Sequence, residues 1–211
     1  KGICQLRNAL LDEAKGEWLL FLDADDYLAT DFIEQSFRDI STGDESLAIV
    51  YPDRTYFGAN EFEVVSEEFS VEKMKHRNII VMCSLVRMSV ARKVGFDISF
   101  ARGLEDYDFF LGIINAGYKA KAQHKSHVFC RVHQKSRTAS IHNDIYRSNR
   151  LMRQIVEKYS NLFSKKEARD VLDYYNVPTA MRLHLWQLLK NKSFLFMGFC
   201  AIKYFFICLV H

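Results

Sequence analysis

The sequence predicts an α/β layered domain followed by a helical region. Up to about residue 140, short apolar segments of strand character alternate with segments of helical period, which is typical of layered α/β domains. Residues 142–190 are largely helical by period, with a break at Pro178, and residues 194–210 are almost wholly apolar. In a chain of 211 residues we therefore expect two parts, 1–140 and 141–211.

The first half of the chain gives the expected elements in order. A helix is predicted over 3–14, with Gly16 as its stop, and a short buried strand over 17–22. The residues that this pattern places on one helical face are Ile3, Leu6, Leu10 and Leu11. Thr30 is expected to cap a second helix that carries Phe32, Ile33 and Phe37. A second strand is expected over 47–51.

Further along, the segment 52–78 is polar and mixed, and its pattern assigns no element. A strand is then expected over 79–88, followed by helical turns over 89–94 that end at Gly95. A helix over 104–115 with Gly117 as its stop precedes two short strands, expected over 118–122 and 127–132.

Composition excludes several function classes. The net charge of +3 is too small to indicate a nucleic-acid partner. The five cysteines are scattered without a CxxC pair, so neither a zinc ribbon nor a disulfide framework is expected, and free thiols in a reducing cytosol are the simplest interpretation. The first residues already have a helical pattern, which leads us to expect a further segment upstream.

The segment Asp23-Ala24-Asp25-Asp26 places three carboxylates directly after the first strand pattern. Such a cluster is either a solvated turn or a site for a cation such as Mg²⁺ or Mn²⁺. A calcium loop of the EF-hand kind is excluded because Leu28 stands where Gly is needed. A phosphatase of the DxDx(T/V) kind is disfavoured because Tyr27 replaces the Thr or Val.

Two later features carry possible chemistry. Glu105, Asp106 and Asp108 lie in the first turn of a predicted apolar helix, where the helix dipole favours acids and where desolvation suits a carboxylate to proton abstraction. His133 follows a predicted strand, and a single histidine is more often structural than a ligand. Each feature alone allows both a structural and a functional interpretation.

Taken in order, these motifs resemble the central signature of family 2 glycosyltransferases, which are inverting enzymes of the GT-A fold. The resemblance extends over about residues 2–138. The segments that carry it are GICQLRNAL at 2–10, AKGEW at 14–18, FLDADD at 21–26, VGFD at 94–97, LEDYD at 104–108, GYK at 117–119 and RVH at 131–133, followed by Ser136.

The resemblance implies a donor site. Asp23 and Asp25 would form the DxD motif, with Asp23 near the donor ribose or the metal and Asp25 on the metal, which is Mn²⁺ or Mg²⁺. His133 would approach the metal or the diphosphate, and Arg7 would lie against the nucleotide. The implied donor is a nucleoside-diphosphate sugar, with a UDP-sugar as the expected one.

The resemblance also implies an acceptor site. Asp106 would be the general base that deprotonates the acceptor hydroxyl, and Glu105 would orient the acceptor or the base. The implied acceptor is a glycan or a lipid-linked sugar, used with inversion in cell-surface polysaccharide biosynthesis. The implied location is cytoplasmic, at the inner face of the cell membrane.

The sequence departs from the family in one respect, because only one helix precedes the DxD strand. We therefore expect a Rossmann-like GT-A sheet that lacks its first βαβ portion, N-terminally truncated. The alternative is a catalytically incomplete fragment or a non-catalytic, membrane-associated binding module. The segment 194–210 is expected to associate with a membrane, or else to pack as a buried C-terminal helix.

Overall fold

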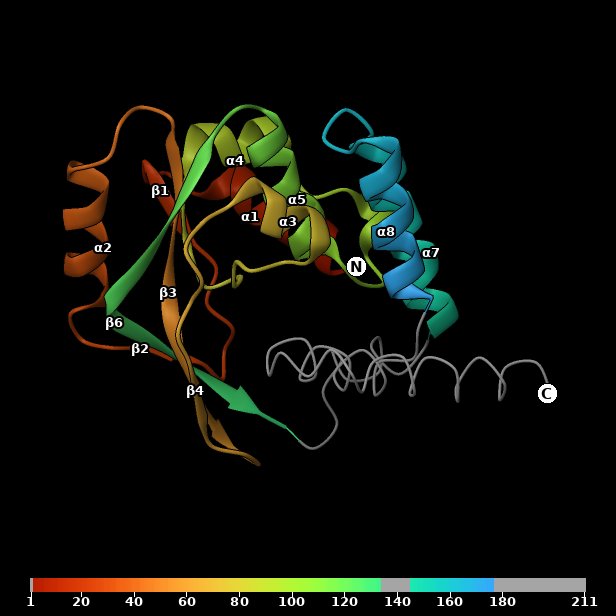
Figure 1. Ribbon diagram of the computed structural model, residues 1–211. Helices are drawn as coiled ribbons and strands as arrows, with labels where there is room; N and C mark the ends of the chain where they lie inside the picture. The colour runs from red at the N-terminus through yellow and green to blue at the C-terminus, as the bar shows by residue number, and fades with distance from the viewer. Residues whose placement is uncertain (1, 134–144, 177–211) are drawn as a thin grey trace.

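The computed structural model describes residues 2–133 and 145–176, and in this part a curled sheet separates one helix from several others (Figure 1). The strands are β1 (Trp18–Leu20), β2 (Tyr27–Leu28), β3 (Leu47–Gly58), β4 (Phe62–Val64), β5 (Leu85–Arg87) and β6 (Lys119–Val132). The helices are α1 (Ile3–Glu13), α2 (Phe32–Ser41), α3 (Val71–His76), α4 (Met88–Val94), α5 (Glu105–Asn115), α7 (Ile145–Lys158) and α8 (Lys165–Tyr175), with a 3₁₀ turn at Ile98–Phe100.

The sheet is built around two long strands. Its order is β1-β5-β3-β6-β2, with β4 paired to β3. The β3–β6 pair is parallel, and the other pairs are antiparallel. The helix α2 covers one face, while α1, α3, α4 and α5 lie on the other side, with α7 and α8 beyond them (Figure 1).

Strand β3 continues well past its expected end at Tyr51, because Pro52 sits at an irregularity of the ladder. Pro52 pairs with Gln123, whereas the next residue, Asp53, pairs with His127. A proline lacks an N–H to donate, so it is tolerated where the ladder is interrupted. The same irregularity lies between the two strands expected over 118–122 and 127–132, which are one strand, β6.

The buried face of α1 differs from the expectation. Cys4, Arg7 and Leu11 are buried, whereas Leu6 and Leu10 are 51% and 48% exposed. The apolar pattern gave the wrong face because it assigns only apolar residues to the buried side, and Arg7 is charged. Arg7 is covered because its charge is paired inside the protein, as described below.

Two other expectations need correction. The strand expected over 79–88 is confined to Leu85–Arg87, because the backbone before it turns, with the Ser84 N–H bonded to the Met82 carbonyl. The N-cap of α2 is Asp31 rather than Thr30, and the carboxylate of Asp31 accepts a hydrogen bond from Ser126 Oγ.

In α2, Phe32 is buried, whereas Ile33 and Phe37 are each 45% exposed. The helices that end before Gly95 and Gly117 are confirmed, and both glycines have positive φ, at 64° and 91°. The helical pattern after residue 142 is confirmed as far as residue 176.

Helices α7 and α8 share the main hydrophobic core with α1, α4 and α5. From α7, Met152 and Ile155 are fully buried in this core, and Val171 of α8 is nearly so. Tyr159 donates to the Asp108 carboxylate in α5 at 2.8 Å. A boundary at residue 140 stays a prediction, and the segment 194–210 lies outside the described residues.

The cysteines and the helices of the described part add two facts. Cys4, Cys83 and Cys130 are buried free thiols, as expected. Within residues 2–133 and 145–176, none of the helices combines the length and the apolar content that crossing a membrane requires.

The packing of α7 gives a stability prediction. Ile155→Ala should lower the free energy of unfolding by about 2–5 kcal/mol, because it leaves a cavity at a fully buried position. Gln154→Ala, at the exposed neighbouring position, is the matched control and should change little. Urea unfolding measures both, and equal effects of the two substitutions would show that α7 does not contribute to the core.

Candidate functional site

The aspartate cluster forms a turn between two strands. After β1 ends at Leu20, the Asp26 N–H donates to the Asp23 carbonyl at 3.1 Å and closes the turn. Strand β2 begins directly afterwards and pairs with the end of β6, with Tyr27 opposite Phe129. This register brings the turn next to the residues that end β6.

Asp25 and His133 meet at this edge of the sheet. Asp25 Oδ2 and His133 Nε2 are 2.6 Å apart, although 108 positions separate them in the sequence. Both side chains are exposed, at 43% and 58%. The hydrogen bond from His133 lowers the pKa of the Asp25 carboxyl, so Asp25 presents a charged carboxylate at the surface.

Asp26 serves a different purpose from its neighbours. Its Oδ1 accepts the Arg131 N–H at 2.8 Å, and its Oδ2 lies 3.9 Å from the Cys83 thiol. Burial raises the pKa of this carboxyl. Asp26 therefore ties the turn to β6, whereas Asp23 and Asp25 are exposed to solvent.

The donor chemistry of the pair fits a metal that also binds phosphate. Within the residues that the structure describes, no group of three His, Cys, Asp or Glu side chains could hold a metal on its own. Mg²⁺, however, is commonly held by one or two carboxylates together with substrate phosphates and water. A carboxylate and an imidazole in contact, as in Asp25 and His133, can supply two positions of such a shell.

A buried ion pair lies at the second group of predicted residues. Arg7 Nη1 and Glu105 Oε1 are 3.4 Å apart, and their side chains are only 9% and 5% exposed. The Arg7 guanidinium also lies 5.8 Å from the ring centre of Phe21 and 5.4 Å from that of Phe96. Arg7 thus connects the segment that leads into Asp23 with the start of α5. Its contact with a nucleotide stays a prediction.

Asp106 is held at the N-terminus of α5. Its Oδ2 accepts a hydrogen bond from Asn78 Nδ2 at 3.1 Å, and its Oδ1 accepts the Tyr107 N–H at 2.8 Å. Asp106 keeps some exposed surface, yet protein atoms surround it closely, and burial together with the nearby Glu105 charge raises the pKa of its carboxyl. A carboxyl with a raised pKa and an exposed edge can accept a proton from a substrate.

The third acid of this turn, Asp108, faces the protein interior. Its carboxylate binds Lys158 Nζ at 2.7 Å and Tyr159 at 2.8 Å, so it fastens α7 to α5. The backbone just before the helix is unusual, since Leu104 has φ of 62°, the one positive φ at a non-glycine position among the described residues. Such a conformation costs roughly 1–2 kcal/mol for a residue with a Cβ and is concentrated at functional sites.

The structure therefore brings the predicted residues together in two groups, Asp25 with His133 and Arg7 with Glu105, the latter next to Asp106 in the chain. Asn78 was missed because it lies in the segment that the sequence pattern left unassigned. Asn8 was missed as well: its amide bonds both the N–H and the carbonyl of Phe96 at 2.8 Å. The adjacent pair Arg7-Asn8 on one helix was the sequence signal that could have pointed to Asn8.

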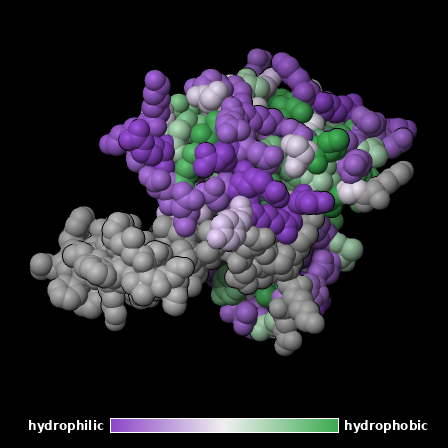
Figure 2. Space-filling model, turned by 90° about the vertical axis from the view of Figure 1, so that its right-hand side faces the viewer, coloured by the Kyte–Doolittle hydropathy of each residue, from purple (hydrophilic) through white to green (hydrophobic). Residues whose placement is uncertain are grey.

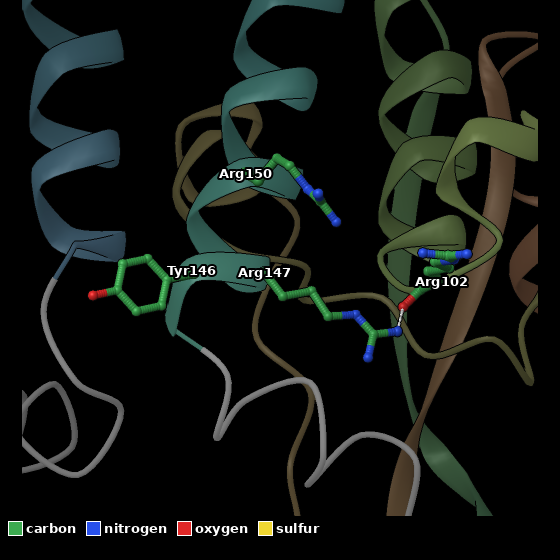
Figure 3. A pocket seen from close by; sticks show the side chains of 4 residues that line it. All are labelled: Arg102, Tyr146, Arg147 and Arg150. Atoms are coloured by element: carbon green, nitrogen blue, oxygen red, sulfur yellow. Dashed lines mark hydrogen bonds between the residues drawn. The ribbon is translucent and has the colours of Figure 1, made fainter.

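An open cavity of about 650 Å³ lies between the loop before α5 and the start of α7. It is lined by Arg102, Tyr146, Arg147 and Arg150 (Figure 3). Sequence reasoning missed this cavity because its arginines come from two segments 45 positions apart, and only the fold brings them together.

Comparison with models of protein families identifies the family of this chain. The family model described as Glycosyl transferase family 2 matches residues 1–107. The chain belongs to this glycosyltransferase family. The matched range includes Arg7, Asp23, Asp25 and the Glu105–Asp106 pair, whereas His133 lies beyond it.

Two curated relatives are similar to this glycosyltransferase chain. UDP-Glc:alpha-D-GlcNAc-diphosphoundecaprenol beta-1,3-glucosyltransferase WfaP of Escherichia coli is 27% identical over 158 residues, which are 74% of this chain and 61% of WfaP. An uncharacterized glycosyltransferase of Haemophilus influenzae is 22% identical, over all of this chain and 74% of the relative. The chain thus spans less than two thirds of WfaP.

Solved structures of S. aureus TarS share the fold of this glycosyltransferase. The complex of TarS with UDP-GlcNAc gives a TM-score of 0.58 at 16% identity, covering 86% of this chain and 52% of that one. The complex with UDP gives 0.51 at 16% identity, covering 85% and 50%. This likeness concerns the fold, and it confirms the predicted GT-A architecture with a helical region after the sheet.

The buried ion pair gives a prediction about stability. Arg7→Met should lower the free energy of unfolding by about 3–5 kcal/mol, because it removes one member of a buried ion pair. The double variant Arg7→Met/Glu105→Leu should recover most of this loss, because no buried charge then remains. Urea unfolding of the two variants is the measurement. A double variant that is less stable than the single one would contradict the assignment of a buried, mutually compensated pair.

Proposed function

We propose that the protein transfers a hexose from a UDP-sugar to a hydroxyl of a lipid-linked sugar acceptor, with inversion at the anomeric carbon. The observation that carries the proposal is the contact between Asp25 and His133 at 2.6 Å, which supports a metal site beside the exposed Asp23–Asp25 turn. The alternative is a non-catalytic binding module, in which Asp106 would serve only to stabilise the start of α5.

On the donor side, Asp25 and His133 would hold a divalent cation, Mn²⁺ or Mg²⁺, and Asp23 would lie toward the ribose. When bound, this cation neutralises the charge that develops on the departing nucleoside diphosphate. The low pKa of Asp25 supports this role, because a metal ligand must be ionised in the working pH range.

On the acceptor side, Asp106 is the general base. The acceptor oxygen attacks the anomeric carbon on the face opposite the diphosphate, the bond between that carbon and the phosphate oxygen breaks, and the acceptor proton moves to Asp106. A single displacement of this kind inverts the configuration. Asn78 holds the carboxylate in place from one side, and the Arg7–Glu105 pair fixes the turn that precedes it.

The relative from E. coli suggests the chemical class of the acceptor. Its name specifies a UDP-Glc donor and a GlcNAc-diphosphoundecaprenol acceptor. By similarity, we assign to this chain a UDP-hexose donor and a polyprenyl-diphosphate-linked sugar acceptor, used in cell-surface polysaccharide biosynthesis. Such an acceptor is embedded in a bilayer, so the enzyme would work at the cytoplasmic face of the membrane.

The metal assignment is tested by donor binding. Asp25→Ala should abolish Mn²⁺-dependent binding of UDP, because the cation loses its carboxylate ligand. Isothermal titration with and without Mn²⁺ measures this effect, and Asp12→Ala, at an exposed position of α1, serves as the control. Unchanged Mn²⁺-dependent affinity in Asp25→Ala would remove Asp25 from the metal site. Absence of UDP binding by the unmodified chain would favour the non-catalytic module.

The base assignment is tested by the pH dependence of transfer. Asp106→Asn should abolish transfer while leaving UDP binding unchanged. Since the base must be ionised, activity falls as the pH drops through the pKa of Asp106. Because that pKa is raised, the fall should occur above the ordinary aspartate value of about 3.9.

The same pH profile in Glu105→Gln provides a sharper test. This substitution removes a negative charge that raises the pKa of Asp106, and it keeps an oxygen that can accept a hydrogen bond from Arg7. The acid limb of kcat/KM should therefore move to lower pH. If the acid limb of kcat/KM lay at the same pH in the variant and in the unmodified chain, this would contradict the role of Asp106 as the titrating base.

A further inference from the structure

Three guanidinium groups face the cavity at the start of α7. Arg147 and Arg150 are three positions apart, so they lie on the same side of the helix, and in Figure 3 both extend toward the loop that carries Arg102. Arg147 Nη2 donates to the carbonyl oxygen of Arg102, which ties the two elements together. The cavity volume of about 650 Å³ is typical of a site for a small organic ligand.

Two of the arginines that line this cavity, Arg102 and Arg150, have no acidic partner in the described part of the protein. Among residues 2–133 and 145–176, no acidic side chain forms an ion pair with Arg102 or Arg150. Like charges brought together in one cavity repel each other, and a bound anion would remove that repulsion. Arginine forks match phosphate oxygens in pairs, so the cavity is suited to a phosphate or a diphosphate.

The cavity is close to the proposed base. Arg102 precedes Asp106 by four residues, a length of chain that reaches at most about 14 Å when fully extended. The backbone between them turns sharply, since Gly103 and Leu104 have φ of 145° and 62°. The Cα atoms of Arg102 and Asp106 are therefore less than about 14 Å apart, within the reach of one sugar ring with its attached phosphates. A sugar whose hydroxyl faces Asp106 can place its own phosphates among the arginines.

The cavity also opens next to an exposed aromatic ring. Tyr146 borders the cavity and is 89% exposed, and in Figure 3 its ring points away from the arginines. Exposed tyrosines of this kind are favoured at the boundary between water and lipid. Figure 2 shows this side of the molecule, on which hydrophilic side chains cover much of the described surface around α7 and α8. Tyr146 is thus an aromatic group beside a basic cavity.

We propose that Arg102, Arg147 and Arg150 bind the diphosphate of the lipid-linked acceptor, with Tyr146 at the start of its prenyl chain. This inference rests on the proposed function, because it assigns the acceptor side of the same reaction. The donor diphosphate is held separately, at Asp25 and His133, so the two phosphate groups of the reaction occupy different sites. The cavity thereby selects acceptors that carry a diphosphate over neutral sugars.

Binding of farnesyl diphosphate, a soluble prenyl diphosphate, tests the inference. Titrations of the full chain in EDTA keep the ligand from binding through a metal at Asp25. The chain should bind farnesyl diphosphate more tightly than pyrophosphate, and farnesol should bind most weakly. Arg150→Gln and Arg102→Gln should each lower the affinity for farnesyl diphosphate about tenfold, which corresponds to the loss of one charge-assisted hydrogen bond.

Two matched controls separate the cavity from general charge effects. Arg153→Gln removes an exposed arginine one turn further along α7 and outside the cavity, and its affinity should match that of the unmodified chain. Tyr146→Ala should lower the affinity for farnesyl diphosphate but not for pyrophosphate, since only farnesyl diphosphate carries a prenyl chain. Circular dichroism of each variant verifies that α7 is still folded.

Several outcomes would overturn the inference. Equal weakening by Arg153→Gln would show a diffuse electrostatic effect, and equal affinity for pyrophosphate and farnesyl diphosphate would contradict a lipid-linked ligand. Displacement of farnesyl diphosphate by UDP would assign the cavity to the donor. If farnesyl diphosphate fails to bind while UDP still binds with Mn²⁺, this inference falls and the proposed function stands; failure of UDP binding alone would instead remove the proposed function.

Discussion

The buried ion pair between Arg7 and Glu105 is the interaction on which the rest of the site depends. Arg7 comes from the first helix and Glu105 from the first turn of α5, and the two aromatic rings against the guanidinium belong to the segment before the DxD turn and to the loop after α4. Charges with so little exposure require mutual compensation. The pair therefore fixes four separate segments relative to one another, and both halves of the proposed reaction are built on those segments.

The two halves of the site are assembled in different ways. The donor side depends on strand register, because a single slip between β2 and β6 would separate Asp25 from His133 and break the Asp26 bond to the Arg131 N–H. The acceptor side depends on a helix start, where a left-handed residue turns the chain and Asn78 orients the carboxylate. The donor side is therefore held by strand pairing, and the acceptor side is held by hydrogen bonds between side chains.

Much of this could be predicted from sequence, because the motifs are local. The DxD turn after an apolar strand, the acids at the start of α5 and the glycines that end α4 and α5 all lie within a few residues of the features that define them. The burial of Arg7 could not be predicted, since it depends on a partner 98 positions away. The exposure of Leu6 and Leu10 follows from the same pairing, because the helix turns its charged residue inward. Asn78 and the arginine cavity likewise depend on long-range contacts that no local pattern encodes.

The shortness of β2 has a consequence for how ligand binding and folding are coupled. The strand pairing of β2 with β6 comprises two residue pairs, Tyr27 with Phe129 and Leu28 with Val128, and Asp25 and His133 lie just beyond them. A ligand that binds both side chains would link β2 to the end of β6, so its binding free energy would add to the free energy of strand pairing. Under the proposed function, the order of this edge of the sheet would therefore be thermodynamically linked to donor binding, and strand formation there and nucleotide capture would become a single cooperative event.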